Sequence, residues 1–177
     1  MIFHPKDLDA GFIILCNEGN IGSLKHTVKS LNFRYENQPY IAVVGKGTST
    51  KNIKEMKEIC PVYKGKDTIT SLINTGMRNT QQEWNLLLFE GSWLHGRELV
   101  RLSQFAEKET DVLFPIVNNV CDFTDGCMNG ILINRKAFKL IGPFSDDNPL
   151  EICKLMWALE AKSKGCRLLG VLGPRII

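Results

Sequence analysis

A glycine-rich turn with one lysine, Gly45-Lys46-Gly47-Thr48, has the residue types best suited to phosphate chemistry. A P-loop requires the pattern GxxxxGK followed by serine or threonine, whereas a glycine follows the lysine here. The dinucleotide-binding pattern GxGxxG also fails, because Thr50 stands where the third glycine belongs. The sequence therefore predicts a glycine-rich turn that leads into a capped helix. A backbone contact to a phosphate is the alternative that this turn leaves open.

A second polar segment precedes the last helical pattern, and its carboxylates are Asp146, Asp147 and Glu151. Pro149 suits the first position of a helix with Asn148 as the N-cap. Glu151 then takes the capping-box position, three residues after the cap and near the positive end of the helix dipole. These positions favour helix capping over catalysis for Glu151.

The bulk composition is that of an ordinary folded protein, since 44% of the 177 residues are hydrophobic and 23% are charged. The net charge of +3 suits a small anionic ligand, but nucleic-acid binding usually needs a clustered basic face. No stretch approaches the roughly 18 apolar residues of a membrane span, and the first ten residues lack the apolar core of a signal peptide. We therefore expect a cytoplasmic protein with no nucleic-acid partner and no membrane span.

The six cysteines form no CxxC pattern of the kind that binds metals or performs redox chemistry. We expect free, buried thiols in a reducing compartment. Because Cys121 and Cys127 share a polar loop, a disulfide between them is the alternative.

Strand and helix patterns alternate along the chain and would position these groups. Continuous apolar runs, typical of strands buried on both faces of a parallel sheet, lie at 11–16, 40–44, 85–89 and 112–115. Helical patterns lie at 53–60, behind Thr48, Ser49 or Thr50, at 69–77, behind Asp67, and at 97–108. In such a sheet, ligands bind at the carboxyl ends of the strands, so residues after Cys16, Val44 and Phe89 become candidates.

The second half of the chain returns to the same sheet after a polar stretch. The pattern predicts a loop over 118–127, a strand over 128–134, a short helix over 135–140, a helix over 149–164 ended by Gly165, and a strand over 167–172. No linker or internal repeat divides the chain. We therefore predict one α/β domain over residues 1–177.

The order of several short segments resembles the family 2 glycosyltransferases, which have the GT-A fold. Their opening strand, the end of the next helix, and their second strand resemble Phe12–Glu18, Ser30-Leu31 and Val43-Val-Gly-Lys-Gly-Thr-Ser49. Later segments of the family resemble Asn74-Thr-Gly76, Glu83–Glu90, Trp93–Leu99 and Asn134–Phe144, followed by a helix that ends at Gly165. The resemblance runs from about Phe12 to Leu172.

This resemblance implies a GT-A-like open, largely parallel sheet with helices on both faces. A nucleotide-binding half would span about 11–115, and a half for the acceptor and the base would span about 116–177. The implied function is a nucleotide-sugar-dependent glycosyltransferase that moves a sugar from its donor onto the hydroxyl of an unknown acceptor.

The family's DxD motif, which holds a divalent cation on the nucleotide diphosphate, corresponds here to Glu90-Gly91-Ser92. Glu90 is the one remaining carboxylate for Mn²⁺ or Mg²⁺, and Ser92 would face the diphosphate with a neutral hydroxyl. We therefore predict either weak metal binding that depends on the diphosphate or a metal-free site. The alternative for Glu90 is a solvated carboxylate at a strand end. The resemblance implies that the nucleotide is bordered by Asn17, Glu18, Gly45 and Lys46.

The resemblance also implies a general base near the start of the last helix, and Asp147 and Glu151 are the candidates. His95 either contacts a ligand or begins a helix beside Gly96. Trp93 has a face suited to stacking on a sugar or a base, whereas Trp84 and Trp157 are expected in the core.

The family's donor-binding aspartates are Gly45 and Lys46 in this chain. Their loss leaves a second interpretation open. It is a non-catalytic GT-A-like module that binds a nucleotide, a sugar or a protein partner.

Overall fold

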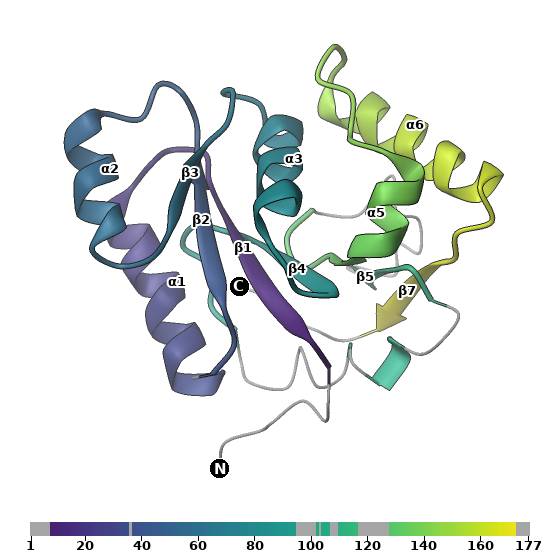
Figure 1. Cartoon of the computed structure of the whole chain (residues 1–177), viewed down its shortest axis with the longest axis horizontal. Helices are drawn as coiled ribbons and strands as arrows, with labels where there is room; N and C mark the ends of the chain where they lie inside the picture. The colour runs from purple at the N-terminus through teal and green to yellow at the C-terminus, as the bar shows by residue number, and fades with distance from the viewer. Residues whose placement is uncertain are drawn as a thin grey trace.

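The computed structural model describes residues 8–35, 37–94, 102, 104–106, 110–116 and 128–172 (Figure 1). His95, Cys121, Cys127 and the expected polar loop over 118–127 lie outside the described residues. The expected helix over 97–108 is described only at 102 and 104–106.

In the described part of the chain, a seven-stranded sheet has the order β3-β2-β1-β4-β6-β5-β7. Its first half is parallel, with β1 (Ala10–Cys16) between β2 (Tyr40–Val44) and β4 (Trp84–Phe89), and with β3 (Val62–Lys64) beyond β2. In the second half, β6 (Leu132–Asn134) is antiparallel to β4 and to β5 (Val112–Ile116), while β7 (Leu168–Leu172) is parallel to β5. The predicted largely parallel sheet is confirmed.

Helices cover both faces of this sheet (Figure 1). One face packs against α1 (Ile21–Arg34) and α2 (Thr50–Lys57), and the other against α3 (Ile69–Asn79), α5 (Arg135–Ile141) and α6 (Leu150–Ser163). Side chains of β1 alternate between the two faces: Phe12 and Ile14 join the first core, and Ile13 and Leu15 the second. Trp84 and Trp157 are buried, as predicted.

Two helix starts differ from the expectation. The Thr68 side chain, not Asp67, caps α3 by accepting the amide hydrogen of Ser71 at 3.2 Å. At α6, Pro149 is the N-cap, with φ −52° and ψ 149°, and no side chain caps the helix. The expected Asn148 cap and Glu151 capping box are therefore wrong, because the chain turns helical one residue later and the N-cap proline has no hydroxyl or carboxyl group to offer.

Other boundaries follow the predictions more closely. The Ser49 hydroxyl caps α2 by accepting the amide hydrogen of Asn52 at 3.1 Å. Gly165, at φ +74°, ends α6 in the left-handed region that glycine adopts easily. The expected strand over 128–134 is shorter, since β6 spans only Leu132–Asn134, although Gly130 and Ile131 still form backbone hydrogen bonds with Leu87 of β4.

The Asn74-Thr-Gly76 segment has a packing role on the second face. The Asn74 side chain accepts from the Phe144 amide at 2.9 Å and donates to the Phe144 carbonyl at 2.8 Å. A Cβ atom at Gly76 would overlap the Ile13 side chain, so glycine is needed for α3 to lie this close to β1. This segment therefore fixes α3 to both the sheet and the chain that leads into α6.

The described cysteines, Cys16, Cys60, Cys153 and Cys166, are free and buried. Burial raises the pKa of Cys60 to about 11 and that of Cys16 further still. Among the described residues, no helix is long and apolar enough to cross a membrane.

Candidate functional site

The carboxyl ends of β1, β2, β3 and β4 reach one edge of the sheet, where their loops gather (Figure 1). The loop after β1 is tied to the first turn of α2, because the Asn52 side chain donates to the Gly19 carbonyl at 3.1 Å. The structure thus brings Glu18, Lys46 and Glu90 to the same edge. This edge is the position at which open α/β sheets bind ligands.

The Glu90 carboxylate holds the loop that joins β1 to α1. Its Oε1 accepts the amide hydrogens of Glu18 and Gly19 at 2.6 and 3.0 Å, and its Oε2 accepts that of Asn20 at 2.8 Å. Burial raises the pKa of Glu90 above its ordinary value, although these three bonds oppose the shift. Because Glu90 is half-buried and bonded to the loop, the alternative of a solvated strand-end carboxylate is wrong.

Ser92 is also engaged by the protein. Its side chain is buried, and its hydroxyl donates to Asn129 Oδ1 at 3.2 Å. The same Asn129 oxygen accepts the Phe89 amide hydrogen at 3.0 Å. Ser92 therefore joins the end of β4 to the turn before β6.

The described residues do not fit a resident metal ion. Both oxygens of Glu90 already accept amide hydrogens, and Ser92 supplies only a neutral oxygen that is bonded elsewhere. Within the described ranges, no group of three or more histidine, cysteine, aspartate or glutamate side chains could hold a metal. A divalent cation would need most of its oxygen ligands from a bound diphosphate.

Asp67, which follows the short strand β3, holds the glycine-rich turn after β2. Its Oδ1 accepts the amide hydrogen of Gly47 at 2.9 Å. Lys46 is exposed between the two glycines. Sequence patterns missed Asp67 as a site residue because β3 has only three residues. The aspartate stabilises the turn and so fixes the position of the lysine.

Replacing Gly45 with alanine is expected to destabilise the protein by about 1–3 kcal/mol, as overpacking does. A Cβ atom at Gly45 would overlap Asp67 Oδ1, the atom that holds the turn. Urea unfolding measures this loss. Gly47→Ala is the matched control, because its Cβ would meet the same oxygen at 3.5 Å, an ordinary contact. Equal losses for the two variants would contradict this role of Asp67.

Asp146 anchors the acidic segment to the start of α3. Its Oδ1 accepts the Thr70 hydroxyl at 2.8 Å and the Thr68 hydroxyl at 3.4 Å, and its Oδ2 lies 3.4 Å from Lys66 Nζ. Because these partners are far from Asp146 in the sequence, no local pattern could predict this role of the aspartate. The anchor places the following residue, Asp147, near the loop between β3 and α3.

The two predicted base residues differ in position. Asp147 is exposed, and its backbone amide donates to the Ser145 hydroxyl at 3.3 Å while its carboxylate has no partner among the described residues. Glu151 is exposed on the first turn of α6, four residues further on. Asp147 is therefore the candidate closer to the anchored Asp146.

Trp93 contacts an exposed histidine of α1. Its ring lies against that of His26, with 4.8 Å between the centroids. His26 is exposed and Trp93 is half-buried, so this pair lies between α1 and the segment after β4.

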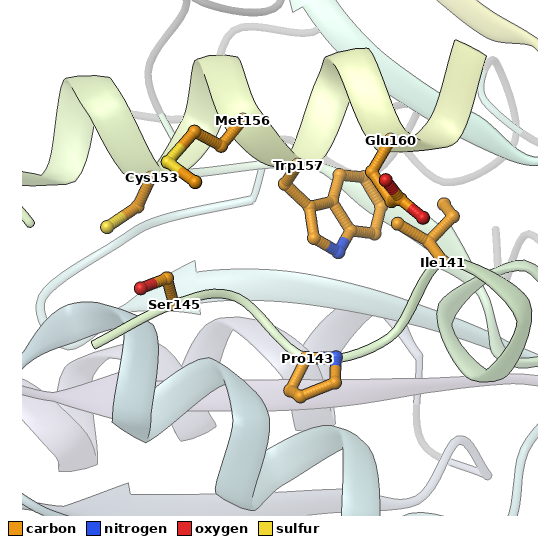
Figure 2. Close-up of a pocket in the computed structure, with 7 residues that line it drawn as sticks. All are labelled: Ile141, Pro143, Ser145, Cys153, Met156, Trp157 and Glu160. Carbon is orange, nitrogen blue, oxygen red and sulfur yellow. The ribbon is translucent and has the colours of Figure 1, made fainter. Parts of the chain in front are cut away.

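A hollow of about 190 Å³ lies between α6 and the segment that leads into it (Figure 2). One wall is Trp157, whose indole donates to the Gly142 carbonyl at 2.9 Å and stacks on Phe144 at 4.5 Å between centroids. The lining residues are Ile141, Pro143, Ser145, Cys153, Met156, Trp157 and Glu160.

Comparisons with known proteins support the fold. No family model and no curated protein matches the sequence. The structure is similar to that of the mannosyltransferase PcManGT from Pyrobaculum calidifontis in complex with GDP-Man and Mn²⁺, with a TM-score of 0.69 and 9% identity. It is also similar to TarS from S. aureus, with a TM-score of 0.66 and 12% identity.

Both similarities cover 96% of this chain, which spans 58% of the mannosyltransferase chain and 36% of the TarS chain. At these identities the similarity shows the fold alone. The α/β fold of this chain is GT-A-like.

Proposed function

We propose that this chain is a nucleotide-sugar-dependent glycosyltransferase that moves a sugar onto an acceptor hydroxyl. The observation that carries the proposal is the position of Lys46 and of the acidic segment, each beside a loop that follows a parallel strand of a GT-A-like sheet. Lys46 follows β2, and Asp146 ties the acidic segment to the loop after β3, the next strand in the sheet. A cation for the leaving diphosphate and a carboxylate for the acceptor are the two charges that the reaction needs.

In the proposed donor site, Asn17, Glu18 and Gly45 border the nucleotide. The exposed ammonium group of Lys46 offsets the diphosphate charge. Ser92 shapes the floor beside β4, and Glu90 holds the loop between β1 and α1 in place. Any Mn²⁺ or Mg²⁺ binds here only together with the diphosphate, because the described residues do not fit a metal ion on their own.

In the proposed reaction, the acceptor oxygen attacks the anomeric carbon of the sugar and forms the new glycosidic bond. Asp147 takes the proton of the acceptor hydroxyl, directly or through one water. The bond between the anomeric carbon and the diphosphate oxygen breaks, and the diphosphate leaves with the electron pair. Lys46 stabilises the charge that develops on it. Glu151 is the second candidate for the base.

A non-catalytic module that binds a nucleotide, a sugar or a protein partner is the alternative function. One observation favours it: the carboxylate that ends β4 is bonded to backbone amides of the protein. A protein of this kind would bind a nucleotide sugar without releasing its nucleoside diphosphate.

The donor-binding part of the proposal predicts a rise in melting temperature with a nucleoside diphosphate or its sugar. A ligand at 100 times its Kd adds about 2.7 kcal/mol to the free energy of unfolding. Lys46→Ala should weaken this binding about tenfold, because it removes the charge that faces the diphosphate. Lys57→Ala is the control, since it removes the same charge from the last turn of α2. No shift with any donor, with or without manganese, would contradict the proposal.

A further inference from the structure

The outer face of α6 carries an exposed apolar stripe, in which Met156 alone has a polar contact in the described structure, with Asn148 Nδ2 4.0 Å from its Sδ. Its members, one and two turns apart, are 46–59% exposed. This spacing places them on one side of the helix, while the opposite side packs into the core through Cys153, Trp157 and Ala161. The α6 stripe consists of Ile152, Leu155, Met156 and Leu159. A contiguous apolar surface of this kind marks an interaction site.

Two charged residues, Glu151 and Lys162, flank the α6 stripe on the same side. They lie eleven residues apart, about three turns at 3.6 residues per turn, so their side chains leave the helix in nearly the same direction. Both are exposed, and neither has an ion-pair partner among the described residues. On the other side of the stripe, Glu160 already pairs with Lys164 at 2.9 Å. The unpaired charges have opposite signs at opposite ends of one flank.

We propose that a second copy of this chain covers the α6 stripe, with the two α6 helices antiparallel about a two-fold axis. An antiparallel arrangement places Glu151 of each copy opposite Lys162 of the other, so two ion pairs form. In a parallel two-fold arrangement the charged flanks of the two copies would lie on opposite sides of the interface, so these ion pairs would not form. The surface is therefore complementary to itself only in the antiparallel direction, as a two-fold interface requires. The apolar side chains of the stripe supply the buried centre of this interface.

This dimer does not require transferase activity, although it shares Glu151, the second candidate for the base, with the proposed site. It nevertheless has a consequence for the site. Asp147 lies three residues before α6 begins, so the second copy would lie next to the acceptor side of each site.

Sedimentation velocity over a range of concentrations tests the dimer. Wild-type protein should sediment as a species of twice the 20.0 kDa chain mass. The double variant Leu155→Glu, Leu159→Glu should raise the dimer Kd by about 100-fold or more, since it places charges in the centre of the interface. Because both leucines are exposed, the variant should keep its circular dichroism and melting behaviour. Phe33→Glu, at a 69% exposed position on α1, should remain a dimer.

Charge reversal tests the antiparallel direction. Glu151→Lys and Lys162→Glu should each raise the dimer Kd about tenfold, because each creates two like-charge contacts. A mixture of the two variants should restore wild-type affinity, since every contact then joins a lysine to a glutamate. This recovery cannot come from a change in the stability of either chain alone. A monomeric wild type, a dimer that survives the leucine substitutions, or a mixture no tighter than its components would each overturn the proposal.

Discussion

Asp147→Asn is expected to lower the rate of sugar transfer by about 10²–10⁴, the usual contribution of a general base. Asparagine keeps the size of the side chain and loses the basic oxygen that accepts the acceptor proton. Donor affinity should stay within a few-fold of wild type, because Asp147 is proposed to contact the acceptor and not the diphosphate. Initial rates at saturating donor, together with donor titrations, separate the two effects.

Glu151→Gln and Asp146→Asn are the comparisons that give this result its meaning. If Glu151 is not the base, its glutamine variant should keep nearly the full rate, since the carboxylate is exposed and caps no amide. Asp146→Asn should lower stability as well as rate, because it weakens the bonds to Thr70 and Lys66 that place the segment. A full rate in Asp147→Asn with a loss of about 10² or more in Glu151→Gln would assign the base to Glu151 instead.

Glu90→Ala is expected to lower the free energy of unfolding by about 2–4 kcal/mol, since hydrogen bonds to charged groups are strong and their loss leaves amides unpaired. Three amide hydrogens at 2.6–3.0 Å lose their acceptor together. The loop between β1 and α1, which borders the proposed nucleotide site, should open first. Urea unfolding gives the free energy, and hydrogen exchange at the amides of Glu18 and Asn20 locates the change.

Two further variants test whether this loss of stability comes from the hydrogen bonds of the Glu90 carboxylate. Glu90→Gln keeps one acceptor oxygen and should lose about half as much, because its NH₂ group faces an amide donor. Glu18→Ala removes the exposed carboxylate of the same loop and should stay within about 0.5 kcal/mol of wild type, as surface substitutions usually do. A stable Glu90→Ala protein would show that the loop does not depend on this carboxylate.

The sheet could be predicted from the sequence because its central strands are continuous apolar runs. Phe12, Val43 and Leu87 lie in three such runs, and burial on both faces leaves each run few alternatives to a central parallel strand. The short strand β3 gave no such signal. Three residues are too few to predict a strand, and β3 forms because β2 beside it supplies the backbone hydrogen-bond partners.

The roles of the acidic side chains were harder to predict, because their partners are distant in the chain. Glu90 bonds to amides about 70 residues earlier, and Asp146 bonds to Thr70, 76 residues earlier. A strand-end carboxylate looks the same in sequence whether it faces a metal, solvent or a loop. The prediction of the N-cap of α6 was wrong for a local reason. The helix starts one residue later than predicted, so Asn148 is not the N-cap and Glu151 is not at the capping-box position.

Release of a nucleoside diphosphate from a nucleotide sugar is the most direct test of the proposed function. Wild-type protein, incubated with a panel of nucleotide sugars and hydroxyl acceptors, with and without manganese, should release the diphosphate from at least one donor. Asp147→Asn should release it about 10²–10⁴ more slowly at the same donor occupancy. Binding of a nucleotide sugar without any release across the panel would contradict the transferase and support the non-catalytic module.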